Sequence, residues 1–173
     1  MSGPGVQTEE EEERHTMADA NMGGEMRYFE DHVPGSTYEF GLVLVEEREI
    51  IDFARRYDPQ VFHVDPEAAK KTPFGGLVAS GWHTVALATR MIVDHELSRV
   101  ASLGSPGIDE LHWWKPVRPG DVLSVRLTIT EARRSLSKPD RGVVKGFIEV
   151  LNQRAEVVTS WKGANIVLCR HPG

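Results

Sequence analysis

Residues 57–84 read YDPQVFHVDPEAAKKTPFGGLVASGWHT. This stretch holds Asp58 and His63 five residues apart, then a Gly-Gly turn, then Ser80-Gly81 at the start of a strongly apolar segment. An Asp/His pair can hold and activate a water molecule, because an imidazole moves protons near neutral pH. Backbone amides at a helix start can stabilise negative charge on a carbonyl oxygen. Each signal is weak alone, since Asp58 could also cap a turn and Ser80 a helix.

The residues before this stretch predict an amphipathic helix that delivers Asp58. From Glu46 onward, apolar residues fall at i, i+3, i+4 and i+7, which is the stripe of a half-buried helix: Ile50, Phe53, Ala54 and Tyr57. Pro59 stops this helix, so Asp58 lies at its exit.

Two more helices are predicted within and after the stretch. Asp65-Pro66 has the pattern of an N-cap followed by proline at the first helical position, and it predicts a short helix through Lys71. Residues 77–97 form the longest helical candidate. Because that segment is apolar nearly all round, it is expected to be buried.

The remaining chain reads as strands. Residues 36–45 precede the helices, and 108–114, 123–130, 143–151 and 157–168 follow them, the last two as a hairpin. Consecutive long strands favour an antiparallel sheet, so we predict an α+β domain in which that sheet wraps around the long central helix. One sheet around one helix leaves an edge uncovered, which predicts a homodimer or a dimer of dimers.

Composition narrows the class of protein. The chain has 173 residues and a formal net charge of −6, which argues against a nucleic-acid partner. A single cysteine, Cys169, excludes an internal disulfide, and no apolar run is long enough for a membrane-spanning helix. We therefore expect a cytoplasmic protein without a membrane partner. Residues 1–27 are predicted to be a flexible acidic tail and residues 28–170 the folded domain.

The histidines do not predict a metal site. His83 and His112 could join His63, but their spacing matches no compact ligand motif and no cysteine cluster supports them. We expect no bound metal, and we expect His83 to lie on the exposed or rim side of the long helix.

The residues from Asp58 to Thr84, together with PVRPGD at 116–121, resemble the MaoC-like family of (R)-specific enoyl-CoA hydratases and dehydratases, which has the hot-dog fold. The resemblance extends over residues 29–168. It implies reversible addition of water to a trans-2-enoyl thioester of coenzyme A, with no cofactor besides the coenzyme A of the substrate. Asp58 and His63 would activate the water, and the Gly81 amide would polarise the thioester carbonyl.

The resemblance also implies substrate-binding residues, and at some positions this chain differs from the usual pattern of the family. Phe62, Phe74 and Trp82 are candidate walls of an acyl-CoA tunnel, and Ser80 and Thr89 are further substrate-binding candidates. Thr89 stands where the family has a hydroxyl side chain two turns into the helix. The family usually has Asn, Pro and His at the positions occupied here by Gln60, Val61 and Ser80.

Two other functions remain open from the sequence. A hot-dog thioesterase would need a carboxylate on the long helix facing the carbonyl, and that helix offers only Asp94 and Glu96 near its far end. A non-catalytic subunit that binds acyl thioesters would share the fold without needing the Asp/His pair.

Overall fold

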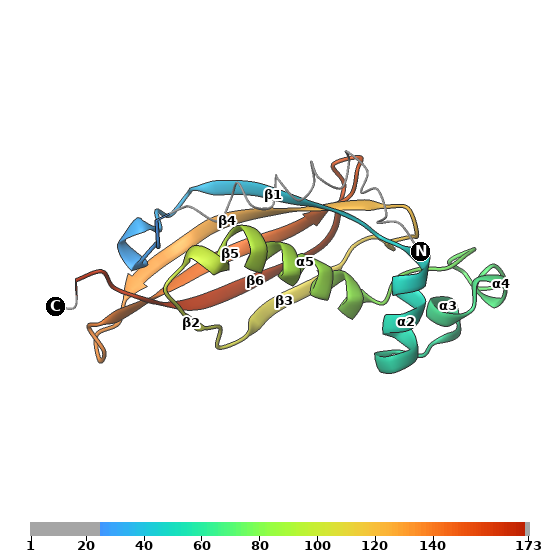
Figure 1. Cartoon of the computed structure of the whole chain (residues 1–173), viewed down its shortest axis with the longest axis horizontal. Coiled ribbons are helices and arrows are strands. Elements are labelled where there is room, and N and C mark those ends of the chain that lie inside the picture. The colour runs from blue at the N-terminus through green and yellow to red at the C-terminus, as the bar shows by residue number, and fades with distance from the viewer. Residues whose placement is uncertain (1–24, 172–173) are drawn as a thin grey trace, which may run out of the picture.

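The computed structural model describes residues 25–171 (Figure 1). Its elements, in chain order, are η1 (Phe29–Asp31), β1 (Thr37–Leu44), α2 (Glu47–Tyr57), α3 (Val61–Val64), α4 (Pro66–Ala69), α5 (Gly81–His95), η2 (Leu97–Arg99), β2 (Ser102–Gly104), β3 (Ile108–Trp113), β4 (Val122–Arg134), β5 (Arg141–Leu151) and β6 (Val157–Leu168). Most of the predicted acidic tail lies outside the described residues. Arg27, the last residue of that prediction, pairs with the backbone around Val100, and its side chain forms an ion pair with Glu96.

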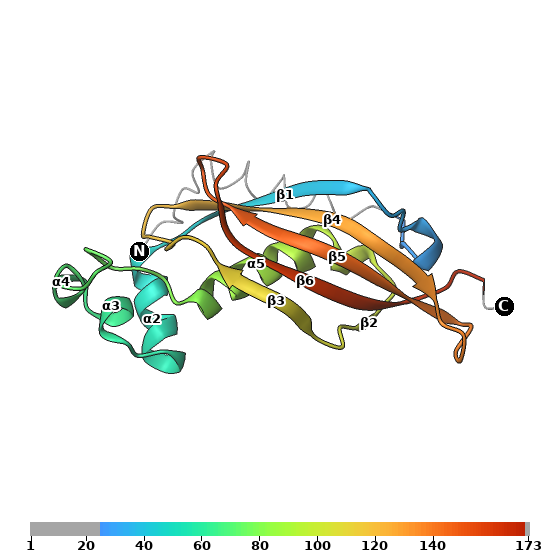
Figure 2. The same ribbon diagram turned by 180° about the vertical axis from the view of Figure 1, so that it is seen from behind.

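The strands form one antiparallel sheet in the order β1-β4-β5-β6-β2, and β3 also pairs with β6 (Figure 2). The chain leaves β1 at one edge, builds the helices, and returns through β2 and β3 at the opposite edge. The strands β4, β5 and β6 then fill the middle as two hairpins. Antiparallel neighbours need only a short turn between them. The adjacency of β4, β5 and β6 in the sheet therefore follows from their being consecutive in the chain.

The helix α5 lies on the concave face of the sheet, which curves around it (Figures 1 and 2). Leu87, Ala88 and Met91 are buried there against the inward residues of the strands, such as Val125 and Val150. Gly41 has φ +76° beside a bulge in β1, and any side chain there would overlap Met91, so a glycine lets β1 approach the helix. The predicted α+β hot-dog fold, a sheet wrapped around one long helix, is confirmed.

The start of the long helix was predicted four residues too early. Residues 77–79 are buried and extended: the Val78 amide donates to the Phe62 carbonyl (3.1 Å), and the Ala79 amide donates to the Val117 carbonyl (2.8 Å). The helix begins only at Gly81, because Ser80 caps it by accepting a hydrogen bond from the Trp82 amide (3.3 Å). This later start places Ser80 and Gly81 at the helix terminus itself.

Two short helices lie between α2 and α5. The predicted helix after Asp65 is present as α4, with the Asp65 carboxylate accepting from the amides of Glu67 and Ala68. The helix α3 was not predicted, since residues 58–63 were expected to be a loop. It brings His63 back toward Asp58, so a single turn of helix shapes the candidate site.

Candidate active site

Asp58 and His63 face each other at the end of the domain where α2, α3 and the start of α5 meet. The His63 Nε2 atom lies 3.5 Å from the Asp58 Oδ2 atom. His63 is 6% exposed, so its imidazole is held by the protein and reaches solvent only through the site. The five-residue step predicted to bring these side chains together does so in the structure.

The backbone fixes which nitrogen of His63 can act as a base. The Nδ1 atom lies 2.7 Å from the Val78 carbonyl oxygen. Because a carbonyl can only accept, Nδ1 carries the proton and the neutral ring presents the lone pair of Nε2 toward Asp58. The extended segment before α5 therefore selects the tautomer that a general base needs.

Both oxygens of Asp58 receive hydrogen bonds. The Ser80 hydroxyl donates to Oδ2 (2.7 Å) and the Gln60 amide donates to Oδ1 (2.8 Å). The Ser80 hydrogen bond is the largest influence and holds the pKa of Asp58 below its ordinary value. Partial burial raises the pKa, while the Gln60 hydrogen bond, and the charge of His63 when that ring is protonated, lower it further. Asp58 is thus kept ionised at neutral pH.

Ser80 was predicted to bind substrate, but in the structure its hydroxyl donates a hydrogen bond to Asp58. Its oxygen accepts from the Trp82 amide, and the side chain is fully buried. Gln60, which the sequence marked only as a departure from the family pattern, is the second group that holds the carboxylate. Both residues therefore position Asp58.

Replacing Ser80 tests this arrangement through the titration of Asp58. In Ser80→Ala the main hydrogen bond to the carboxylate is lost, so we expect the pKa of Asp58 to rise. That pKa is lower in the folded state than in the unfolded chain. Ionised Asp58 therefore stabilises the fold at pH values above its ordinary pKa of 3.8, and this stabilisation is lost as the pH falls through the folded pKa. Ser80→Ala should therefore unfold at a higher pH during acid titration.

The pKa is measured by NMR of the Asp58 side-chain carboxyl. Ser102→Ala is the control, because Ser102 also donates a side-chain hydrogen bond but to Asn165, at the other end of α5. An unchanged Asp58 titration in Ser80→Ala would contradict the positioning role.

Gly81 is the first residue of α5 and packs directly under an aromatic ring. A Cβ atom at this position would overlap the indole of Trp113. Within residues 25–171 the Gly81 amide has no hydrogen-bond acceptor, as expected for the first turn of a helix. The amide is therefore available to a ligand, and its partial positive charge suits an anionic or carbonyl oxygen.

These groups open onto a cavity of about 520 Å³. Phe62, Phe74 and Trp82 lie in its wall, as the sequence proposed. The other side of the wall comes from a segment whose role the sequence did not predict, residues 113–117 with the Trp113-Trp114 pair. The only signal for this wall in the sequence is the Trp-Trp-Lys run just before the turn at 116–121, and paired tryptophans favour core and interface packing. The cavity is mostly apolar around a small polar cluster, which is typical of ligand sites.

Thr89 and His83 are not part of this cluster. The Thr89 hydroxyl donates to the Val85 carbonyl (2.8 Å), and its side chain lines a separate cavity at the other end of α5. His83 was expected on an exposed side; that prediction is wrong, because the residue is 2% exposed and stacks on Phe53 at 4.8 Å between α2 and α5. Among residues 25–171, no group of three His, Cys, Asp or Glu side chains is placed to hold a metal ion.

The family model described as MaoC like domain matches residues 24–149 of this chain. The chain belongs to the MaoC-like family. The match spans every element of the site, from the helix that delivers Asp58 to the Trp113-Trp114 segment. It is thus a member of a family of hydratases and dehydratases with the hot-dog fold.

Solved structures agree with this family and fold. A MaoC-like dehydratase from Rhodospirillum rubrum is 39% identical, with a TM-score of 0.75, and the match covers 84% of this chain and 99% of that one. A monoamine oxidase regulatory protein from Archaeoglobus fulgidus is 29% identical, with a TM-score of 0.78, over 87% and 99% of the two chains. The R-hydratase PhaJ1 from Pseudomonas aeruginosa, at 24% identity and a TM-score of 0.62 over 83% and 86%, shares the fold.

None of the helices in the described part of this MaoC-like protein is long and apolar enough to cross a membrane.

Proposed function

We propose that this MaoC-like protein adds water reversibly to a trans-2-enoyl thioester of coenzyme A. The observation that carries the proposal is the convergence of Asp58, His63 and the free Gly81 amide on one apolar cavity. A conjugated thioester needs three things for hydration: an activated water, a proton donor at the α-carbon, and stabilisation of charge on the carbonyl oxygen. The site offers a group for each of them.

The dyad is suited to holding one water molecule. The Asp58 carboxylate can only accept hydrogen bonds, and so can Nε2 of neutral His63. Asp58 Oδ2 and His63 Nε2 therefore cannot hydrogen-bond to each other without a proton between them. A water can donate one hydrogen to each, which turns its oxygen lone pairs toward the cavity. The hydrogen bonds from Ser80 and Gln60 keep the carboxylate in the orientation that this requires.

In the proposed reaction the water oxygen forms a bond to the β-carbon while His63 Nε2 takes the proton that the water releases. The electron pair of the double bond moves to the α-carbon and the thioester oxygen, where the Gly81 amide stabilises it. The protonated His63, stabilised by the charge of Asp58, then gives its proton to the α-carbon. Dehydration follows the same steps in reverse, so the dyad returns to its starting state without a cofactor.

A thioesterase is less well supported by the same residues. It would need a carboxylate of the long helix near the thioester, but Asp94 is paired with Arg90 (2.6 Å) on the surface. Glu96 is paired with Arg27 beyond the end of α5. Neither residue lines the cavity that holds Asp58.

The direct test uses the full chain with crotonyl-CoA and longer 2-enoyl-CoA substrates. Hydration is followed as the loss of absorbance of the conjugated thioester, and free thiol is measured in parallel. Hydration without thiol release supports the proposal. Thiol release without hydration would indicate a thioesterase, and tight binding without turnover would indicate a non-catalytic acyl-binding subunit.

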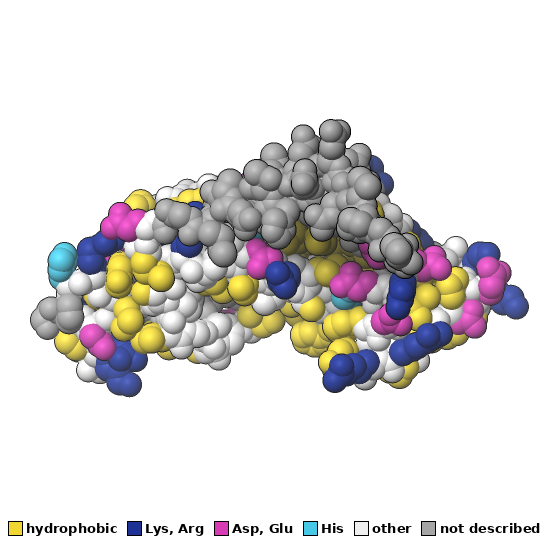
Figure 3. Space-filling view, in the orientation of Figure 1, with side chains coloured by type: hydrophobic (Ala, Val, Ile, Leu, Met, Phe, Trp, Pro, Cys, Tyr) yellow, Lys and Arg dark blue, Asp and Glu magenta, His cyan; other side chains and the backbone are white. Residues whose placement is uncertain are grey.

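We also propose that two copies pair through the edge of the sheet beyond β6. In the orientation of Figure 3, hydrophobic side chains are exposed on the face that carries α5. Large apolar side chains of β2 and β3 and the residue after β3 are about half exposed: Leu103, Ile108, Trp113 and Trp114. An exposed strand edge with this many apolar side chains favours association.

We expect Leu103→Lys to shift the protein from dimer to monomer in size-exclusion chromatography with light scattering. Leu42→Lys is the matched control, since Leu42 is 82% exposed on β1 at the opposite edge. A monomeric wild-type chain, or equal behaviour of the two variants, would contradict pairing at this edge.

A further inference from the structure

His83 is a buried histidine that the proposed reaction does not use. It lies on α5 two residues after Gly81, is 2% exposed, and stacks on Phe53 of α2. Both ring nitrogens are shielded from solvent, and neither finds a hydrogen-bond partner in the part of the chain that the structure describes. A neutral imidazole carries one N–H, and an unpaired buried donor costs stability. Packing alone therefore does not explain a histidine at this position.

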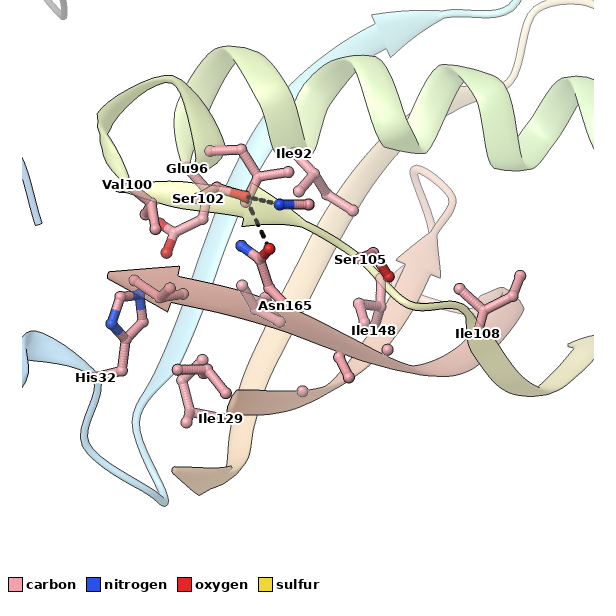
Figure 4. A pocket seen from close by; sticks show the side chains of 18 of the residues that line it. His32, Ile92, Glu96, Val100, Ser102, Ser105, Ile108, Ile129, Ile148 and Asn165 are labelled. Carbon is pink, nitrogen blue, oxygen red and sulfur yellow. Dashed lines mark hydrogen bonds between the residues drawn. The ribbon is translucent and has the colours of Figure 1, made fainter. Parts of the chain in front are cut away.

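Two other buried histidines show the usual arrangement. His63 is fixed by the Val78 carbonyl, which lies 2.7 Å from its Nδ1 atom. His32, in the cavity at the other end of α5, is fixed in the same way by the Tyr28 carbonyl, 2.8 Å from its Nδ1 atom (Figure 4). His83 has no such bond, so a phenylalanine in its place would fill the same space without burying an unpaired N–H.

Glu49 is the one charged side chain, among residues 25–171, that acts on the His83 ring. Its Oε1 atom lies 3.5 Å from His83 Nε2, and the Glu49 side chain is 51% exposed. This distance is longer than a charge-assisted hydrogen bond, for which about 2.7–2.9 Å is usual. The other titratable groups at this end of the domain are engaged elsewhere: Arg48 with Asp52, Asp58 with Ser80 and Gln60, His63 with Val78, and Lys115 with Glu156.

Protonation of His83 is unfavourable while α2 is docked on α5. Burial lowers the pKa of His83 below its ordinary value of 6.5, and the charge of Glu49 opposes this only in part. If α2 moves away and water reaches the ring, the proton is taken up at the ordinary value. Acid therefore favours the undocked helix, by up to about tenfold for each pH unit between 6.5 and the pKa of the docked ring.

The docking of α2 determines where Asp58 stands. α2 lies beyond the end of the sheet and packs against the start of α5 (Figures 1 and 2). The Asp58 amide donates to the carbonyl of Ala54 (2.8 Å), the residue after Phe53, so Asp58 is attached to the last turn of α2. On α5, Ser80 binds the Asp58 carboxylate three residues before His83. The Phe53–His83 and Asp58–Ser80 contacts therefore join the same two helices.

We infer that His83 is a proton-sensitive positioning residue. Its neutral ring docks α2 on α5 and so holds Asp58 beside Ser80, and the protonated ring releases the helix. This inference rests on the proposed hydratase function where it concerns activity, because Asp58 is taken to activate the water. It adds regulation: activity declines in weak acid, between pH 7 and about pH 5, for a reason other than protonation of the base His63.

The first test uses the full chain without substrate. NMR follows the His83 ring and the Asp58 side-chain carboxyl from about pH 7.5 to about pH 5. We expect the Asp58 signal to move together with the titration of His83, well above the pH at which Asp58 itself takes up a proton. In His83→Phe this step should vanish. A step caused by His63, which lies 3.5 Å from Asp58, should persist.

His32→Phe is the matched control. Burial lowers the pKa of His32 as well, but the residue lines the cavity at the other end of α5, so its replacement should leave the Asp58 titration unchanged. Unfolding in urea at about pH 7.5 gives a second comparison. His83→Phe should be at least as stable as wild type, because an unpaired N–H is removed. His32→Phe should be less stable, because the hydrogen bond to the Tyr28 carbonyl is lost.

The pH profile of hydration separates this role from a merely structural one. The ratio of kcat/KM at about pH 5 to kcat/KM at about pH 7.5 should be at least about threefold higher in His83→Phe than in wild type. Glu49→Gln should lower that ratio, because the Glu49 charge helps the docked ring to accept a proton. Glu47→Gln removes the same charge from the same turn of α2 and should match wild type. The Glu49 variant keeps the test open if His83→Phe fails to fold.

Three results would overturn the inference: an Asp58 titration that is unchanged in His83→Phe, equal pH profiles of His83→Phe and wild type, or a Glu49→Gln profile equal to that of Glu47→Gln. Failure of the proposed function looks different. In that case no 2-enoyl-CoA is hydrated at any pH, while the Asp58 signal still moves with the titration of His83 and this step is still lost in His83→Phe.

Discussion

Asp58→Asn is expected to lower kcat/KM for hydration of 2-enoyl-CoA by about 10²- to 10⁴-fold, the range for loss of a general acid/base group. The amide keeps the size of the carboxylate and can still meet Gln60 and Ser80, but it carries no charge to orient the water or to stabilise protonated His63. His63→Asn should cause a similar loss. The asparagine amide can still donate to the Val78 carbonyl, so the fold is retained while the base at Nε2 is removed.

Asp52→Asn separates this effect from a general loss of negative charge on α2. Asp52 lies on the same helix, and within residues 25–171 its one ion pair is with the exposed Arg48, at 3.5 Å. Its replacement should leave kcat/KM within about twofold, in line with the small contribution of exposed ion pairs. If Asp58→Asn and His63→Asn fold normally and retain more than a tenth of the activity, the dyad is not the catalytic centre.

Gly81→Ala is expected to impair both the fold and the activity, since the added methyl group would overlap the Trp113 indole. Forcing one extra carbon into a packed contact costs typically about 1–3 kcal/mol, and here the displaced ring is also a wall of the cavity. We therefore expect a lower free energy of unfolding in urea and a loss of hydration activity of at least tenfold.

A double variant distinguishes the steric explanation from others. Trp113 is 48% exposed, so Trp113→Ala should fold, and it removes the ring that the methyl group would strike. In the Trp113→Ala background, Gly81→Ala should cost much less stability than it does alone, a coupling that a double-mutant cycle measures. Equal costs in the two backgrounds would show that the Gly81–Trp113 contact does not explain the glycine.

The larger elements could be predicted because their patterns are local. The stripe from Ile50 to Tyr57 gives α2, and the alternation at 123–130 gives the first part of β4. The limits of α5 were harder: Leu77, Val78 and Ala79 are as apolar as the helix that follows, and only the Ser80 cap separates them. The helix α3 has only four residues, too few to show a helical periodicity. The sequence therefore did not predict that this turn of helix brings His63 back toward Asp58.

The candidate site was predictable in its members but not in its hydrogen bonds. Asp58 and His63 are five residues apart in the sequence, and so short a connection limits the distance between their side chains. Ser80 reaches Asp58 across 22 residues, and Val78 reaches His63 across 15. Those contacts depend on the path of the backbone through residues 70–80, which residue types alone do not determine. His83 was misplaced for the same reason, because its burial depends on the docking of α2 against α5.

The pairing of β1 with β4 has a consequence for how the domain is assembled. Thr37 lies opposite Thr128, and the whole segment that carries Asp58, His63 and Gly81 is the loop closed by this pairing. Closing so long a loop is entropically costly, whereas β4, β5 and β6 can form from neighbouring hairpins. The Ala79 amide, just before the Ser80 cap, also donates a hydrogen bond to the Val117 carbonyl, which lies after all the helices and shortly before β4. The arrangement of Asp58, His63 and Gly81 therefore belongs to the complete domain, and a nascent chain that has not yet reached β4 cannot hold it.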